Sequence, residues 1–109
     1  MRCRFSMFSA VFAVASVSAA LAGAMPDSAR QVELAHLVRH DCGSCHGMTL
    51  RGGLGGPLLP ADLAHYSRED VAELILDGVP GTPMPPWRGN LSEDDALWIA
   101  QRLKEGFPK

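Results

Sequence analysis

Two cysteines and a histidine stand close together near the middle of the chain, in the stretch Cys42-Gly-Ser-Cys45-His46. Residues at positions i, i+3 and i+4 of a helix share one face, so Cys42, Cys45 and His46 point the same way if this stretch is helical. C-x-x-C-H is the attachment signature of c-type haem, in which two thiols bond to the vinyl groups and the imidazole binds iron. The motif therefore predicts one covalent haem c, attached through Cys42 and Cys45, with His46 as an axial ligand.

Two other chemistries use the same residue types. A redox-active C-x-x-C dithiol belongs in a strand–helix context, and nothing before Cys42 has the pattern of a strand. A zinc site needs a fourth ligand beside Cys42, Cys45 and His46, and a better spacing. The haem interpretation is favoured over both.

A second unusual stretch, GTPMPPW at residues 81–87, surrounds one methionine with three prolines. Proline fixes its own φ and restricts the residue before it, so this stretch cannot be helix and makes a poor strand. A stiff loop would hold a thioether at a fixed point, and methionine on haem iron raises the reduction potential. Met84 is therefore predicted as the second axial ligand. Met48, Met25 and His65 are the alternative ligands, and a plain packing role for Met84 is the other possibility.

The first 24 residues have the pattern of a secretory signal peptide. Two arginines form a positive start, residues 5–21 are an uncharged run rich in Ala, Val and Phe, and residues 22–24 make a small-x-small cleavage site. We expect cleavage after Ala24 and a periplasmic location. The mature protein would then be a single haem-binding domain of residues 25–109. The competing interpretation is an uncleaved membrane anchor, but the run of 17 residues falls short of the ~20 strongly apolar residues that a span needs.

Charge and size restrict the class of the mature chain. Loss of Arg2 and Arg4 reduces the 10 basic residues to eight, against 12 acidic ones, which gives a net charge of −4. Without a basic surface, a nucleic-acid partner is not expected. A domain of 85 residues is small for a self-sufficient core and usually needs disulfides or a cofactor. A bridge between Cys42 and Cys45 would staple nothing distant, so a cofactor is expected to hold the fold together.

Three amphipathic helices are expected around the motif. The first begins at Asp27 or Ser28, the second begins in a capping box at Ser67 and ends at Gly78, and the third begins at Ser92 with three acids near the positive end of the helix dipole. The expected apolar positions are Val32, Leu34, Leu37 and Val38; Val71, Leu74 and Ile75; and Ala96, Leu97, Ala100 and Leu103, with Trp98 alongside.

The segment RGGLGGP at residues 51–57 contains four glycines. A phosphate loop would continue with Lys-Ser/Thr and follow a strand, and neither feature is present. A backbone that passes close to a flat ligand explains these glycines better. Arg51 and Arg88 either contact haem propionates or are ordinary surface charges. His36 and His40 are four residues apart, a spacing that can clip a metal ion, although a solvated helix face is the simpler interpretation.

The order helix, CxxCH, Gly/Pro loop, helix, PMP loop, helix resembles a class I monohaem cytochrome c over residues 27–105. The resemblance implies a small all-α fold of three to four helices wrapped around one covalent haem. It implies that the carbonyl of Pro57, within the segment GPLL, accepts the Nδ1–H of His46. It also implies that Trp98 packs across the first helix and that Trp87 lines the haem near a propionate; plain packing of Trp87 is equally compatible.

The runs DCGSCHGMTLRGGLGGPLLP and PGTPMPPW resemble, more narrowly, the cytochrome c55X group, small cytochromes encoded beside cytochrome cd1 nitrite reductase in denitrifying bacteria. This resemblance implies an electron carrier, not an enzyme, whose partner is that reductase; the alternative is an accessory role in maturing its d1 haem. A haem enzyme or gas sensor is a further class, and it needs an open or displaceable sixth position. The prolines around Met84 argue against displacement.

Overall fold

The computed structural model describes residue 13 and residues 25–107, so the predicted signal peptide lies almost wholly outside the described residues. The described part is helical and contains no strand. Its elements in chain order are α1 (Ser28–Leu37), the π-helix η1 (Val38–Cys42), α2 (Gly43–His46), α3 (Pro60–Leu63), α4 (Arg68–Asp77) and α5 (Glu93–Glu105). In residues 13 and 25–107, no helix combines the length and apolar character needed to cross a membrane. The expected small all-α fold is confirmed.

The first three elements follow one another without a break from residue 28 to residue 46. Asp27 caps the start, because its carboxylate accepts a hydrogen bond from the Arg30 N–H at 2.8 Å, as the sequence predicted. Leu34 and Val38 are fully buried, whereas Val32 is 71% exposed and the expectation for it was wrong. Val32 is two residues from Leu34, and at 3.6 residues per turn such positions lie on nearly opposite sides of a helix.

The π-helix η1 connects α1 to the CxxCH motif. Its wider turn is closed by a hydrogen bond from the Gly43 N–H to the Val38 carbonyl, five residues back. A short π-helical insertion rotates the following residues relative to the preceding α-helix, and such insertions are frequent at functional sites. The face of α1 therefore does not continue directly into the face that carries Cys42, Cys45 and His46.

Capping boxes begin both α4 and α5; the one at Ser67 was predicted, whereas at Ser92 the sequence predicted only a helix start with three acids. At α4, the Asp70 N–H donates to Ser67 Oγ at 3.0 Å and the Ser67 N–H donates to the Asp70 carboxylate at 3.3 Å. At α5, Ser92 and Asp95 exchange the same pair of bonds at 3.0 and 3.2 Å. Gly78, with φ of +66°, follows the end of α4.

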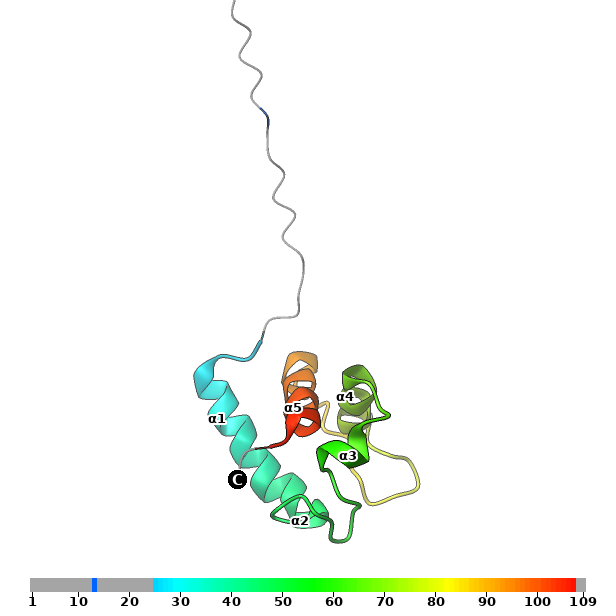
Figure 1. The fold of residues 1–109 in the computed structure, drawn as a ribbon. Helices are drawn as coiled ribbons and strands as arrows, with labels where there is room; N and C mark the ends of the chain where they lie inside the picture. Colours follow the sequence, from blue (N-terminus) through cyan, green and yellow to red (C-terminus); the bar gives the residue numbers. More distant parts are fainter. Residues whose placement is uncertain (1–12, 14–24, 108–109) are drawn as a thin grey trace, which may run out of the picture.

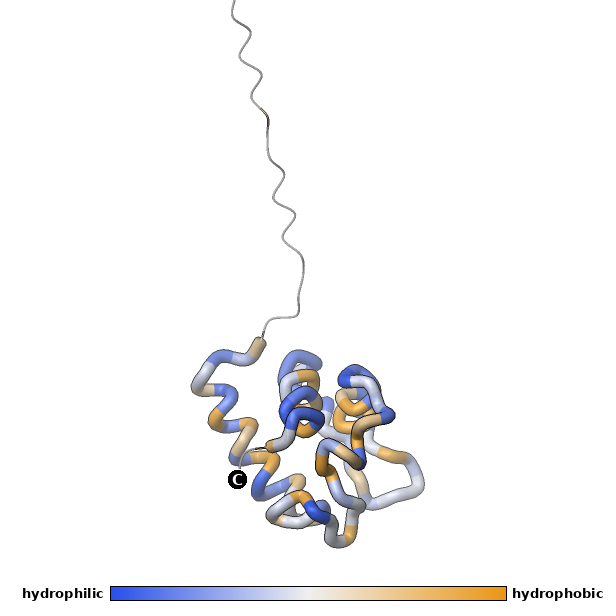
Figure 2. The backbone as a smooth tube through the Cα atoms, in the orientation of Figure 1, coloured by the Kyte–Doolittle hydropathy of each residue, from blue (hydrophilic) through white to orange (hydrophobic). Residues whose placement is uncertain are grey.

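Helices α4 and α5 lie side by side, and the α1 segment lies alongside α5 (Figure 1). Hydrophobic and hydrophilic residues alternate along all three helices (Figure 2). The buried apolar core consists of Leu34, Val38, Leu50, Leu63, Val71, Ala72, Ile75, Leu76, Leu91, Ala96, Ile99, Ala100 and Leu103. Leu74 is 41% exposed, so its predicted place in the core was wrong: burial recurs at Val71/Ala72 and Ile75/Leu76, four residues apart, which leaves Leu74 on the solvent side.

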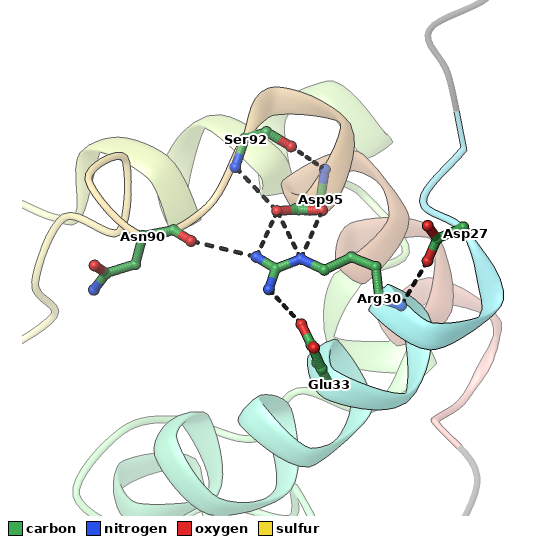
Figure 3. A network of polar contacts seen from close by, with 6 residues as sticks. All are labelled: Asp27, Arg30, Glu33, Asn90, Ser92 and Asp95. Carbon is green, nitrogen blue, oxygen red and sulfur yellow. Dashed lines mark hydrogen bonds and ion pairs between the residues drawn. The ribbon is translucent and has the colours of Figure 1, made fainter.

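An ion pair joins α1 to the start of α5 (Figure 3). The Arg30 guanidinium donates to the Asp95 carboxylate, with Nη2 2.8 Å from Oδ2 and Nε 3.4 and 3.3 Å from Oδ1 and Oδ2. Arg30 also bonds to Glu33 at 2.8 Å. Asp95 is the one polar residue among the buried residues of the described chain, at 7% exposure. This ion pair holds the first turn of α5 against α1.

Candidate functional site

The CxxCH motif lies where the π-helix passes into α2. Cys42 is the last residue of η1 and is half-buried, Cys45 lies in α2 and is exposed, and His46 ends α2. Both cysteines are free thiols. Burial raises the pKa of the Cys42 thiol to about 11, and the nearby charge of Asp41 adds to the increase. Redox-active C-x-x-C pairs have a lowered thiol pKa, so the environment of Cys42 argues against the dithiol interpretation.

The imidazole of His46 is oriented by a backbone carbonyl. Its Nδ1 lies 2.7 Å from the carbonyl oxygen of Gly56. A carbonyl oxygen only accepts, so Nδ1 must carry the proton and Nε2 keeps its lone pair for a metal. The resemblance implied the Pro57 carbonyl as the acceptor, and the structure places this bond one residue earlier, at Gly56.

The glycine loop explains this difference. The Gly52 N–H donates to the His46 carbonyl and the Gly55 N–H donates to the Cys45 carbonyl, each at 2.8 Å. These two bonds hold the loop against α2. As a result the Gly56 carbonyl, and not the Pro57 carbonyl, lies within hydrogen-bond distance of the His46 ring. Pro57 still has a role, because proline restricts the backbone of the residue before it and so limits the directions in which the Gly56 carbonyl can point.

One glycine of this loop lies directly against the histidine ring. A Cβ on Gly55 would lie 2.7 Å from Cε1 and 2.8 Å from Nδ1 of His46. No side chain fits at those distances without a shift of the ring or the backbone. The sequence predicted that the glycines let the backbone approach a flat ligand; at Gly55 the structure shows a close approach to the His46 imidazole instead.

The proline-rich loop is tied to the end of α4. A Cβ on Gly78 would lie 2.7 Å from the Met84 carbonyl oxygen, and the Val79 N–H donates to that oxygen at 3.3 Å. Thr82 Oγ1 donates to the Val79 carbonyl at 2.7 Å and accepts from the Met84 N–H at 3.3 Å. The Met84 backbone is therefore held by hydrogen bonds as well as by its proline neighbours.

The same loop is fixed again at its far end. The Trp87 N–H lies 3.1 Å from the carbonyl oxygens of Ile75 and Leu76, and the Arg88 N–H donates to the Leu76 carbonyl at 3.0 Å. Trp87 is half-buried and packs against the core. Arg88 forms ion pairs with Asp77 at 2.8 Å and Glu93 at 3.7 Å. These contacts close a short rigid loop around Met84.

The alternative ligand residues differ from Met84 in exposure. Met84 is half-buried, whereas Met25 and Met48 are 75% and 61% exposed. His65 is exposed, and its ring lies against the Tyr66 ring at a centroid distance of 4.4 Å. Of these residues, Met84 alone combines partial burial with a backbone held in place.

Trp98 lies at the contact of α1 and α5, as the resemblance implied. A cavity of about 350 Å³ there is lined by Ser28, Gln31, Val32, Ala35, Trp98, Arg102 and Phe107. The Phe107 ring meets the Trp98 ring edge-on at a centroid distance of 6.3 Å, and the Arg102 guanidinium lies 5.9 Å from the Trp98 centroid. Trp98 therefore belongs to the packing between α1, α5 and Phe107.

The donor set fits a covalently attached haem. One helical turn offers two thiols and an imidazole whose Nε2 is free to bind iron, which is the set that the attachment chemistry requires. In residues 25–107, no three side chains of His, Cys, Asp or Glu are arranged to hold a metal ion. The zinc interpretation of the CxxCH motif therefore lacks a converging set of three or more such ligands in the described part of the chain.

Comparison with known proteins gives a consistent assignment. Residues 29–101 match the family described as cytochrome c oxidase, cbb3-type, subunit III. Cytochrome c55X of Paracoccus denitrificans is 62% identical over 78 residues, which cover 72% of this chain and 76% of the relative. Cytochrome c55X of Pseudomonas aeruginosa is 55% identical over 86 residues, which cover 79% of this chain and 72% of the relative.

Solved structures agree with the sequence relatives. The c-type cytochrome NirC superposes with a TM-score of 0.73 at 54% identity, covering 75% of this chain and 96% of that one. This level of similarity confirms the resemblance stated from the motifs. The chain belongs to the cytochrome c55X group of monohaem c-type cytochromes, which makes it a carrier of one covalently attached haem c that transfers electrons.

Proposed function

We propose that the haem is attached through Cys42 and Cys45 and that its iron is ligated by His46 Nε2 and Met84 Sδ. The observation that carries the assignment of His46 is the 2.7 Å contact between its Nδ1 and the Gly56 carbonyl. It fixes the tautomer that leaves Nε2 available, and a carbonyl partner also raises the basicity of the ligating nitrogen. Bound haem supplies reversible one-electron chemistry at iron.

The second ligand is assigned to Met84 on the rigidity of its loop. Val79, Thr82 and the flanking prolines hold the Met84 backbone, so little conformational entropy is lost when the thioether is fixed. A thioether ligand favours reduced iron. Six-coordinate iron with a stiff sixth ligand suits an electron carrier better than an enzyme or a gas sensor, and we propose that the protein is not an enzyme.

We further propose that the protein is exported to the periplasm, that residues 1–24 are removed, and that it donates electrons to cytochrome cd1 nitrite reductase during denitrification. The similarity to cytochrome c55X from two bacteria and to NirC supports the proposal. The mass of the protein purified from periplasm tests the cleavage. A chain that begins at Met25 is expected, and a full-length chain in the membrane fraction would contradict export as a cleaved protein.

Partner contact is proposed at the side of the molecule that carries the exposed Cys45. Leu54, 94% exposed, follows Gly53 in the loop whose Gly55 bonds to the Cys45 carbonyl. An exposed apolar side chain beside the attachment motif suits a small, transient interface of the kind electron-transfer partners form. Haem attached at Cys45 would have its edge near this surface, which shortens the path of the electron.

Stopped-flow mixing of the reduced cytochrome with oxidised nitrite reductase tests the donor role. We expect oxidation of the cytochrome at a rate no slower than enzyme turnover, without a complex that survives gel filtration. Leu54→Ser should slow the bimolecular rate, while Val32→Ser, an exposed apolar position on α1, should leave it unchanged. Transfer much slower than turnover would contradict the donor role and leave the haem ligands unaffected.

A second candidate function is an accessory role in d1 haem maturation. The observation in its favour is a match to the dihydro-haem d1 dehydrogenase of Pseudomonas aeruginosa, 39% identical over 73 residues, which cover 67% of this chain and 15% of that protein. The solved structure of the dehydrogenase NirN superposes with a TM-score of 0.62 at 34% identity over 68% of this chain and 16% of that one. A deletion strain that accumulates nitrite reductase without d1 haem would favour this role over the donor role.

A further inference from the structure

Two histidine rings lie against each other on the surface where α1 passes into the π-helix. The centroids of His36 and His40 are 4.1 Å apart and the ring planes are inclined by 40°. Both residues are exposed. Within residues 25–107, neither ring takes part in a hydrogen bond or an ion pair, and each ring contacts the other. All four ring nitrogens are therefore available to solvent or to a ligand.

This arrangement has the form of a two-residue metal clip. Histidines at i and i+4 of a helix present their imidazoles on one face, and helical zinc sites use this spacing. Neutral imidazole is the commonest metal ligand among protein side chains, and it suits zinc, copper and nickel. We propose that His36 and His40 together chelate one divalent transition-metal ion at the surface, with water in the remaining coordination positions.

The neighbouring acidic residues do not belong to this site. Glu33 lies one turn before His36 but is paired with Arg30 at 2.8 Å, and no three metal-ligating side chains converge in the described part of the chain. The site thus has two protein ligands, and open coordination positions remain. It is distinct from the haem site, because it uses none of the residues of the CxxCH motif or the Met84 loop.

Calorimetric titration of the mature haem-loaded protein with Zn²⁺ tests the proposal. Zinc is redox-inactive, so it leaves the oxidation state of the haem unchanged. We expect one zinc ion per chain, and a loss in affinity of at least about tenfold in His36→Ala and in His40→Ala, since even outer-shell changes at metal sites cost about that much. Both positions are exposed, so these variants are expected to fold.

Two control variants make the test specific. His65→Ala removes an exposed histidine that is paired with Tyr66 instead, and it should leave the affinity unchanged. The double variant Arg39→His/His40→Arg keeps the composition but places the second imidazole at the preceding position of η1, away from the face of His36, and it should lose zinc as His40→Ala does. Absence of stoichiometric binding by the wild type, or binding that survives the exchange or either single alanine substitution, would overturn the proposal.

Discussion

The Arg30 guanidinium of α1 donates to both carboxylate oxygens of Asp95, 65 residues later, at the start of α5. The same carboxylate accepts a hydrogen bond from the Ser92 N–H at 3.2 Å. One buried side chain thus completes the capping box of α5 and ties that helix to α1. Removal of its charge should weaken both contacts at once.

Asp95→Asn is expected to lower the free energy of unfolding by about 1–2 kcal/mol, since a charge-assisted bond is lost while the Arg30 side chain, 36% exposed, remains hydrated. Asp70→Asn is the matched control: Asp70 holds the same position in the capping box of α4 but is exposed, and within residues 25–107 it has no arginine partner on another helix. Urea unfolding of the haem-loaded variants measures both values. Equal losses would show that the Arg30 contact contributes nothing beyond the cap.

The same pair predicts how stability depends on pH. The hydrogen bond from Arg30 holds the pKa of Asp95 below its ordinary value of 3.8. A lowered pKa in the folded state contributes stability that is fully present above the unfolded value and is lost as the pH falls through the folded value. The stability difference between wild type and Asp95→Asn should therefore be constant above about pH 5 and shrink in more acidic buffer. A difference that grows on acidification would contradict the ion pair.

Covalent attachment predicts that haem stays with the chain after denaturing electrophoresis and acid–acetone extraction. Cys42→Ala/Cys45→Ala, expressed with a haem-attachment system, should lose all covalent haem, because no other thiol lies in residues 25–107. Haem staining of the denatured protein measures this. Covalent haem in a folded double variant would refute the assignment of both thiols.

Ligation by Met84 predicts a weak sulfur-to-iron band in the far red of the oxidised protein. Met84→Ala should abolish the band and lower the reduction potential, because the thioether favours reduced iron. Met48→Ala is the control, since Met48 is 61% exposed and should leave both properties unchanged. Loss of six-coordination in Met48→Ala or His65→Ala, with the band kept in Met84→Ala, would assign the ligand elsewhere.

The contact between Gly55 and the His46 ring predicts a difference between adjacent glycines. In Gly55→Ala the new methyl would lie 2.7 Å from Cε1 of the ring, and we expect a loss of about 1–3 kcal/mol in unfolding free energy from overpacking, together with a changed reduction potential. In Gly56→Ala the methyl meets nothing within 4 Å, so that variant should resemble the wild type. Potentiometric titration and thermal melting of both variants check the prediction.

Local chemistry made much of the fold predictable. The caps at Asp27, Ser67 and Ser92 depend on residues within one helical turn, and all three occur where the sequence predicted them. Long-range contacts carry no such local pattern. Asp95 was interpreted as one of three acids at a helix start, and nothing near it in the sequence indicates that its partner is Arg30.

The same distinction applies to the site. The spacing of Cys42, Cys45 and His46 was enough to predict that they share one helix face, because all three lie within about one helical turn. The π-helix before it has no sequence signature of its own, and it was not predicted. The resemblance implied Pro57 as the acceptor for His46, whereas the structure has Gly56. Hydrogen bonds from Gly52 and Gly55 to α2 determine how closely the loop lies against the helix, and no sequence pattern indicates them.

The close fit of His46 between the Gly56 carbonyl and the Gly55 backbone has a kinetic consequence. An imidazole that donates to a backbone carbonyl and lies against the backbone of the preceding residue would swing or tilt little when the charge on a bound iron changes. If His46 ligates the iron, as proposed, little nuclear motion would accompany the arrival or departure of an electron, and the reorganisation energy at this ligand would be small, as in sites whose dipoles are fixed before the reaction. Gly55 and Gly56 would thereby favour rapid uptake and rapid release of an electron by the haem.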